Sequence, residues 1–230
     1  MAKIKHLYGE LEAAWQGGAA DRFANLIRSN IAELDPAGRE GERSALWLAA
    51  SIGSEESLRL LLKKGFAVSS KCPRTGWVPL YAATFWNHLE AVKVLLLEGR
   101  AAPDLADNYG QTSLMRAAID GNLAIATTLL DYRAKVDIGD CDGRTALMLA
   151  SSRKRTEIVR LLLGRKANPD LQDIQGVTAL MKAGNSEICR LLLDFRADVW
   201  LGDHMGATVF DYMKHRPVIL DLLERRRLGC

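Results

Sequence analysis

The 230-residue sequence predicts an all-α fold, a solenoid of helix–turn–helix units with short β-hairpin-like turns. A long segment recurs with the same pattern from Asp104, Asp137 and Asp170, the central copy reading DIGDCDGRTALMLASSRKRTEIVRLLLGRKA. Each copy holds two short segments of helical apolar periodicity. Turn glycines recur at spacings of 34, 33, 33 and 30 residues, and they are Gly76, Gly110, Gly143, Gly176 and Gly206. A period near 33 residues leaves room for one turn and two short helices.

The repeated unit resembles the ankyrin repeat family over nearly the whole chain. The resemblance rests on the Asp-x-x-Gly turn, the Thr-Ala-Leu-Met-Leu-Ala stretch at 145–150 and the Glu-Ile-Val-Arg-Leu-Leu-Leu stretch at 157–163. It implies a shared scaffold whose partners differ from protein to protein. The family's Thr-Pro-Leu-His start is never intact. We expect packing to replace the hydrogen bonds of its histidine, whose place is held by Trp47, Tyr81, Met115, Met148 and Met181.

The order of units predicts a single ankyrin-repeat domain over residues 1–230. Residues 7–34 are irregular and are expected to form an N-terminal cap, residues 35–200 the repeats, and residues 201–230 a C-terminal cap. The unit from Leu171 lacks three residues between Ala183 and Gly184, almost one helical turn. We therefore expect its first helix to be a turn short, leaving a notch in the groove. Pro217 suits the first turn of the last helix.

The aspartates that recur before the turn glycines have a structural explanation, and so do the recurring apolar positions. Asp107, Asp140, Asp173 and Asp203 each stand three residues before a turn glycine, where a carboxylate can accept backbone N–H bonds. One acid per turn cannot supply the six or more oxygens that Ca²⁺ prefers. The apolar positions of successive units should be buried, and they include Leu114, Leu129, Leu147, Leu162, Leu180 and Leu192.

A series of basic residues stands where the ankyrin pattern has glycine after the second helix, namely Arg100, Arg133, Lys166 and Arg196. A side chain in the left-handed region costs about 1–2 kcal/mol. One interpretation is a positive stripe for an acidic partner or phosphate groups. The other is inheritance from one duplicated ancestor, with Asp104, Asp137 and Asp170 partly neutralising the first three.

Composition predicts an intracellular protein, cytoplasmic and/or nuclear, and excludes several function classes. The net charge of +3 is too balanced to indicate nucleic-acid binding. The sequence shows neither a signal peptide nor an 18-residue apolar span, so no membrane insertion is expected. Four scattered cysteines and four scattered histidines predict neither a disulfide framework nor a metal site. Phosphate-loop, nucleophile-elbow and zinc-protease motifs are absent, so we expect no catalysis and no cofactor.

The candidate binding residues come from turn tips and from the places just before the turn between the two helices of a unit. In ankyrin-like repeats these places face the concave groove, which is an implication of the resemblance. The aromatic and apolar candidates are Trp77, Phe85, Trp86, Tyr109 and Ile119, and the charged candidates are Arg116, Asp120, Arg144 and Arg153. Clustered surface aromatics are typical of protein-contact hot spots. Alternatively, Trp77 and Trp86 fold over each other to cover an imperfect repeat.

These features predict a non-catalytic scaffold or adaptor that binds another protein through the groove and hairpin tips. The partner would offer an acidic or an aromatic and apolar segment, and the chain alone would be a monomer. Two alternatives remain open. The chain could be a constitutive structural subunit of a larger assembly, or a regulatory module of an enzyme.

Overall fold

The computed structural model describes residues 2–34 and 44–227, with side chains placed for residues 6–34 and 44–224. The start of the predicted repeats at residue 35 and the end of the predicted C-terminal cap lie outside the described residues. The described residues form α-helices and turns without β-strands. Isolated antiparallel bridges close two turns, at Gly139–Thr145 and Gly202–Thr208. The all-α class with hairpin-like turns is confirmed.

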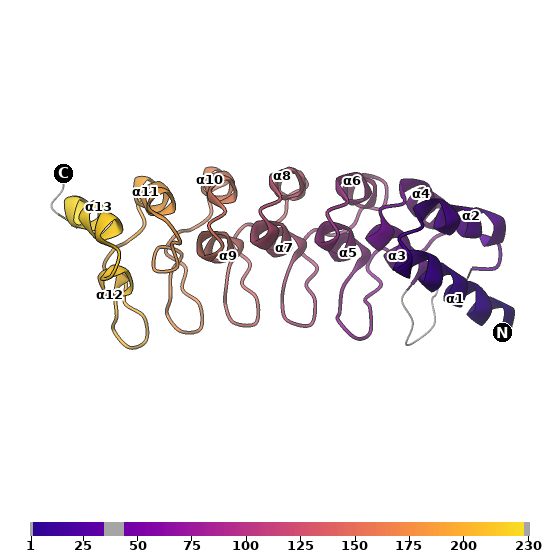
Figure 1. Cartoon of the computed structure of the whole chain (residues 1–230), viewed down its shortest axis with the longest axis horizontal. Helices are drawn as coiled ribbons and strands as arrows, with labels where there is room; N and C mark the ends of the chain where they lie inside the picture. Colours follow the sequence, from indigo (N-terminus) through magenta and orange to yellow (C-terminus); the bar gives the residue numbers. More distant parts are fainter. Residues whose placement is uncertain (1, 35–43, 228–230) are drawn as a thin grey trace. The chain divides into compact units, whose positions relative to one another are not determined.

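The chain divides into two compact units, Met1–Ser113 and Leu114–Cys230, and each is described by itself. The described residues of the first unit form three helix pairs, α1 to α6. Within it α1, α3 and α5 pack in succession, as do α2, α4 and α6, so the helices form two layers (Figure 1). Their bounds are α1 Ala2–Gln16, α2 Ala20–Asn30, α3 Ala45–Ile52, α4 Glu55–Lys63, α5 Pro79–Phe85 and α6 Leu89–Leu97.

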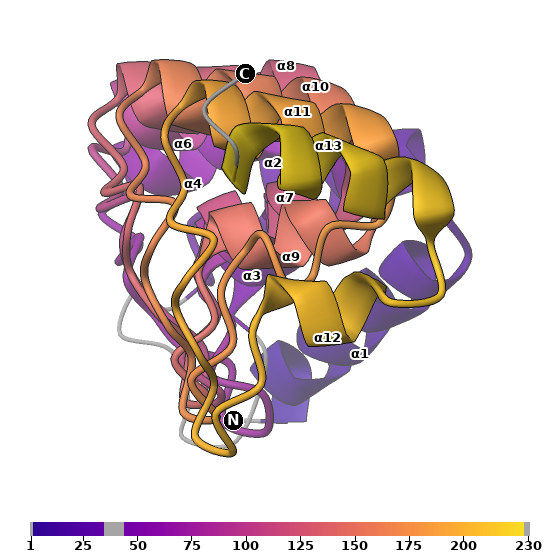
Figure 2. The same cartoon turned by 90° about the vertical axis from the view of Figure 1, so that its left-hand side faces the viewer.

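The second unit repeats this arrangement, with α8, α10, α11 and α13 packed in succession. Its hairpin turns lie together on one side of the helices (Figure 2). The bounds are α7 Ser113–Asp120, α8 Leu123–Asp131, α9 Ala146–Ser152, α10 Thr156–Gly164, α11 Ser186–Asp194, α12 Val209–Met213 and α13 Pro217–Arg227. The six leucines predicted to be buried are each at most 2% exposed. Pro217 begins α13, as predicted.

The turn aspartates act as predicted. In each of the four turns, one carboxylate oxygen accepts two backbone N–H groups of its own turn, at 2.8–3.0 Å. Asp173 also accepts from Lys182 Nζ at 2.6 Å. Burial, the largest influence, raises the pKa of Asp173, but the bonds from Lys182, Val177 and Gln175 together outweigh it and hold that pKa below its usual value.

The basic series adopts the left-handed conformation that its position predicts. The φ angles of Arg100, Arg133, Lys166 and Arg196 are +51°, +65°, +65° and +63°. The hydrogen bonds that close the preceding helix impose this conformation. In one unit Lys166 N donates to Leu163 O at 2.9 Å and Ala167 N donates to Leu162 O at 3.0 Å.

The shortened repeat from Leu171 differs from the prediction, because its first helix is absent rather than one turn short. Residues 179–182 form turns, with one helix-like bond from Lys182 N to Thr178 O at 3.2 Å. The corresponding helix of the preceding repeat, α9, has only seven residues. Removing three of seven residues leaves a single turn, and an isolated turn does not propagate into a helix.

Candidate partner-binding site

Four aromatic side chains of the first unit form a continuous stack, here called the aromatic cluster. Trp77 lies 5.0 Å from Tyr81 and 4.6 Å from Phe85 between ring centroids, and Phe85 lies 5.2 Å from Trp86 in an edge-on arrangement. Tyr81 and Phe85 can both contact Trp77 because they are four residues apart and so lie on one face of α5. Tyr81 is buried, Trp77 and Phe85 are half-buried, and Trp86 is 48% exposed. The cluster therefore anchors Trp77 and leaves one face of Trp86 open.

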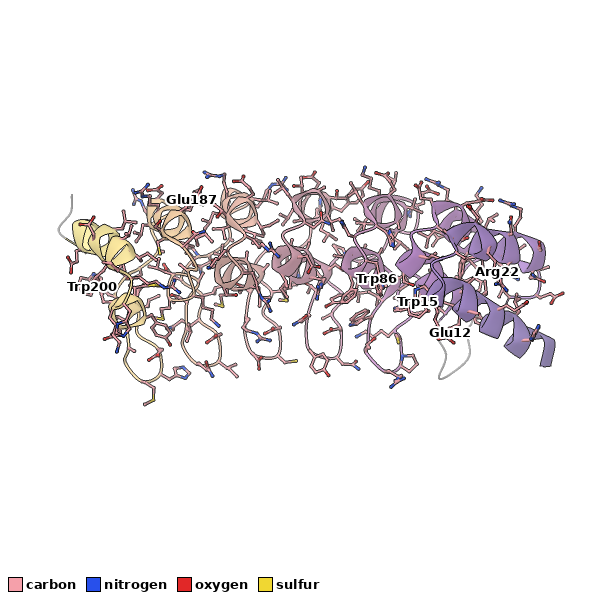
Figure 3. All side chains as sticks on the ribbon, in the orientation of Figure 1. Glu12, Trp15, Arg22, Trp86, Glu187 and Trp200 are labelled. Atoms are coloured by element: carbon pink, nitrogen blue, oxygen red, sulfur yellow. The ribbon has the colours of Figure 1, made fainter. Side chains whose placement is uncertain are left out.

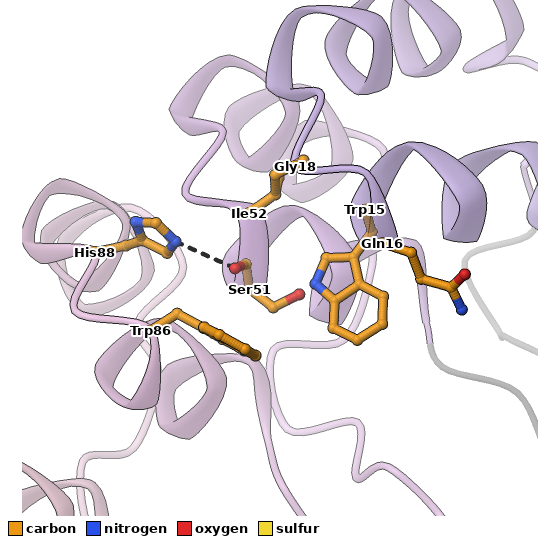
Figure 4. A pocket seen from close by; sticks show the side chains of 7 residues that line it. All are labelled: Trp15, Gln16, Gly18, Ser51, Ile52, Trp86 and His88. Atoms are coloured by element: carbon orange, nitrogen blue, oxygen red, sulfur yellow. Dashed lines mark hydrogen bonds between the residues drawn. The ribbon is translucent and has the colours of Figure 1, made fainter.

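The open side of Trp86 forms one wall of a pocket of about 520 Å³ within the first unit. The other wall is Trp15, and Ser51 lies between the two indoles (Figure 4). Gln16, Gly18, Ile52 and His88 complete the lining. These residues come from the ends of α1, α3 and α5 and the turns that follow them. Figure 3 shows Trp15 and Trp86 on the ribbon of this unit.

The walls of the pocket are held by defined contacts. Trp15 packs against the buried Trp47 in a T-shaped arrangement, with 5.7 Å between ring centroids. His88 Nε2 donates to the carbonyl oxygen of Ser51 at 3.1 Å, which places the imidazole proton on Nε2. The imidazole also lies against Gly53, whose φ is +75° and where a Cβ atom would come within 2.6 Å of Nδ1. The pocket is therefore built before any partner arrives.

His88 contributes no formal charge to the pocket near neutral pH. Burial lowers the pKa of His88, and the hydrogen bond to Ser51 only partly opposes this effect. The residues that line the pocket include no Asp, Glu, Lys or Arg among those that the structure describes. Two indoles and an uncharged lining suit an apolar or aromatic side chain.

The hairpin tip that follows the aromatic cluster presents Tyr109, which is 70% exposed. Its backbone is fixed, because Tyr109 N donates to Asp107 Oδ1 at 2.8 Å and Asn108 N donates to Thr75 O at 3.2 Å. Four of the nine predicted binding residues, Trp77, Phe85, Trp86 and Tyr109, thus belong to the first unit.

The other five predicted residues belong to the second unit, and most of them are engaged there. Arg116 binds Asp120 through two N–H groups, one at 2.7 Å. Arg144 forms ion pairs with Asp140 and Asp142, both at 2.9 Å, and Asp140 is the largest cause of its raised pKa. The half-buried Ile119 accepts at its carbonyl oxygen from Arg155 Nε at 3.0 Å. Arg153, at the end of α9, is exposed.

Sequence reasoning missed Trp15 and His88. The alignment of units contains a signal for the first, because Trp15 and Gln16 stand just before Gly17, as Ser51 and Ile52 stand just before Gly53. Such an alignment would have placed Trp15 in the groove series. The role of His88 depends on the carbonyl oxygen of Ser51 in the preceding repeat, and the sequence neighbours of His88 give no signal for it.

Among the residues that the structure describes, no group of three or more His, Cys, Asp or Glu is placed to hold a metal ion. No helix of the described segments has the length and apolarity to cross a bilayer. Among the described residues, Cys141 and Cys189 form no disulfide, and the burial of Cys189 raises its pKa to about 11.

Comparison with known proteins identifies the repeat. The family model described as "Ankyrin repeats (3 copies)" matches in overlapping windows, at residues 11–104, 70–140, 95–173 and 114–203. Protein phosphatase 1 regulatory subunit 12A of Mus musculus is 36% identical over 70 residues, which is 30% of this chain and 7% of that protein. The protein of the same name from Rattus norvegicus has the same identity and coverage. The similarity spans a small part of these relatives.

Proposed function

The chain belongs to the ankyrin repeat family, and from this membership we propose that it is a non-catalytic scaffold that binds a partner protein. Ankyrin repeats generally mediate protein–protein interaction. The proposed contact surface in the first unit comprises the aromatic cluster, the pocket beside it and the hairpin tip at Tyr109. An intracellular location, cytoplasmic or nuclear, and a monomeric state remain parts of this proposal. Fluorescence microscopy of the tagged chain and sedimentation of the purified chain test them.

The observation that carries the proposal is the half-exposed Trp86 at the wall of a preformed pocket. An indole that is 48% exposed contributes little to the fold, yet it is packed against Phe85 and so loses little freedom on binding. Tryptophans in such positions dominate the binding energy of many interfaces. The partner class that fits is a protein that inserts an apolar or aromatic side chain between Trp15 and Trp86.

Partner capture with matched variants tests the proposal. We would compare wild type, Trp86→Ala and Leu97→Ala as baits in native extract. Leu97 is the matched control, since it is apolar, 65% exposed and carried by the outer helix α6 of the same unit. Removal of a hot-spot side chain that contributes about 2 kcal/mol to the binding free energy weakens binding about 30-fold. Proteins that Leu97→Ala retains and Trp86→Ala loses support the proposal.

One result would reject the proposal that the partner binds at the pocket. Equal capture by Trp86→Ala and wild type, with both shown folded by circular dichroism, would mean that the partner contacts another surface. Precipitation or self-association of the isolated chain would instead favour a constitutive subunit of a larger assembly, for which the 59% exposed Trp200 of the second unit offers apolar surface.

One observation favours a regulatory role as a second candidate. The relatives matched over 70 residues are named as regulatory subunits of a protein phosphatase. The test is to assay the captured proteins for phosphatase activity. Activity that is captured by wild type and lost with Trp86→Ala supports this role, and a capture without phosphatase activity rejects it.

A further inference from the structure

The three-residue deletion leaves a hollow in the second unit, here called the notch, of about 430 Å³. Lys154, Gly184, Ser186, Arg216 and the first residues of α13 line it. Gly184 N donates to Ser151 O at 3.1 Å, which draws the shortened segment against the end of α9. Arg216 reaches the segment from the other side, donating from Nη1 to Ala183 O at 2.9 Å. The notch has the volume of many small-ligand sites.

The cationic groups of the notch have no carboxylate partner within the described part of the chain. Elsewhere in the second unit Arg116, Arg144 and Arg165 each form an ion pair with a carboxylate. Among the described residues, neither Lys154 nor Arg216 forms an ion pair, and the lining contains no carboxylate. Two unpaired cations therefore face one hollow.

Lys154 occupies its position at a conformational cost. Its φ is +58°, and the equivalent places in other units hold Gly53, Asn87 and Gly121, residue types that tolerate this conformation. A Cβ atom on Gly184 would come within 2.4 Å of Lys154 Cγ, so the lysine stem crosses the space that the glycine leaves open. As at Lys166, the bonds that close the preceding helix impose this conformation, from Lys154 N to Ser151 O at 3.3 Å and from Arg155 N to Ala150 O at 2.9 Å.

The helix starts reinforce the positive field of the notch. α11 begins at Ser186 and α13 at Pro217, so the first residues of two helices, nine and eleven residues long, line the notch. Each N-terminus carries a partial positive charge. We propose that the notch binds an oxyanion, the phosphate of a phosphorylated side chain or the carboxylate of an acidic one, carried by the partner protein. The identity of the carrier rests on the proposed function.

A titration of the full chain with inorganic phosphate tests the notch directly. We would follow ¹H–¹⁵N amide shifts of Gly184, Ser186 and Val218, with sodium chloride of equal ionic strength as the reference. Wild type should show saturable shifts at these amides with phosphate. Absence of saturable shifts beyond those of chloride would overturn the proposal.

The chain offers a closely matched pair of variants for this titration. Lys154→Gly removes a charge and relieves a positive φ at the notch, while Lys166→Gly does the same at φ +65° outside its lining. Lys154→Gly should bind phosphate about tenfold more weakly, the equivalent of one charge-assisted hydrogen bond, and Lys166→Gly should bind as wild type does. Equal affinity of both variants would overturn the proposal. Lys154→Asn, which copies Asn87, serves if the glycine variant does not fold.

Two further probes separate the sources of the oxyanion. Tighter binding of N-acetyl-phosphoserine amide than of acetate assigns the notch to a phosphorylated side chain, and the reverse order assigns it to Asp or Glu. Because the titrations contain no partner protein, their failure is distinguishable from failure of the Trp86→Ala capture experiment.

Discussion

Replacing Lys166 by glycine should stabilise the protein, although it removes a side chain. Lys166 has φ +65°, and its N–H and that of Ala167 are bound to carbonyls of α10, so the conformation cannot relax while the helix end persists. Relief of left-handed strain contributes about 1–2 kcal/mol. The greater freedom of glycine in the unfolded chain offsets about 0.4–1 kcal/mol of this. The expected net gain is about 0.5–1 kcal/mol.

Urea denaturation followed by circular dichroism measures this gain, and two controls identify its cause. Lys166→Ala removes the charge but keeps the strain, so it should not stabilise. Arg165→Gly, at φ −92° next to it, should destabilise, since no strain is relieved there and the ion pair of Arg165 with Asp131 is lost.

Glycine substitutions at Arg133 and Arg196, which lie in other repeats, should stabilise the protein independently of Lys166→Gly. The triple variant should therefore gain about 1.5–3 kcal/mol in the free energy of unfolding. A Lys166→Gly protein no more stable than Lys166→Ala would refute the strain argument. It would then leave the charge of these residues as the feature that requires an explanation.

Three further outcomes are expected. Leu147→Ala, at a side chain 1% exposed, should cost about 2–5 kcal/mol in urea denaturation, and a loss below about 1 kcal/mol would contradict the predicted core. Gly53→Ala should destabilise more than Gly65→Ala: both have positive φ, but only the first places a Cβ against His88, so equal losses would exclude that contact. Because its folded pKa is depressed, the Asp173 carboxylate contributes stability above its unfolded pKa of about 3.9, and this is lost as pH falls further. Asp173→Asn should therefore flatten the acid side of the stability–pH curve, and an unchanged slope would contradict the role of the Lys182 pair.

Some features of the fold were predictable because they are local and repeated. The role of Asp140 in its turn depends on residues two and four positions away, and the left-handed φ of Lys166 depends on the end of its own helix. Both are properties of one unit, so one copy of the pattern predicts the others. At residues 179–182 the shortening was predicted but the absence of a helix was not. The alignment of repeats shows the deletion, but it does not show whether the remaining turn persists as a helix.

The candidate site was predictable only in part. Exposure of Trp86 followed from its place before the turn, but its pocket needs Trp15 from α1 and His88 bound to Ser51. Arg144 was predicted as a charged binding residue, yet its ionic partners Asp140 and Asp142 belong to its own turn. Whether a charge is free depends on side-chain conformations, and these are decided by packing rather than by position in the repeat.

The repeat, the buried leucines, the turn carboxylates and the strained helix ends were predictable, because each follows from periodicity or from contacts within a few residues. Which surface is hollow and which charges form ion pairs depends on how distant segments pack. Trp15 and Trp86 are 71 positions apart in the chain, and Lys154 and Arg216 are 62 apart. Each pair shares a pocket or a notch because the packing of three successive repeats brings these segments together within one compact unit.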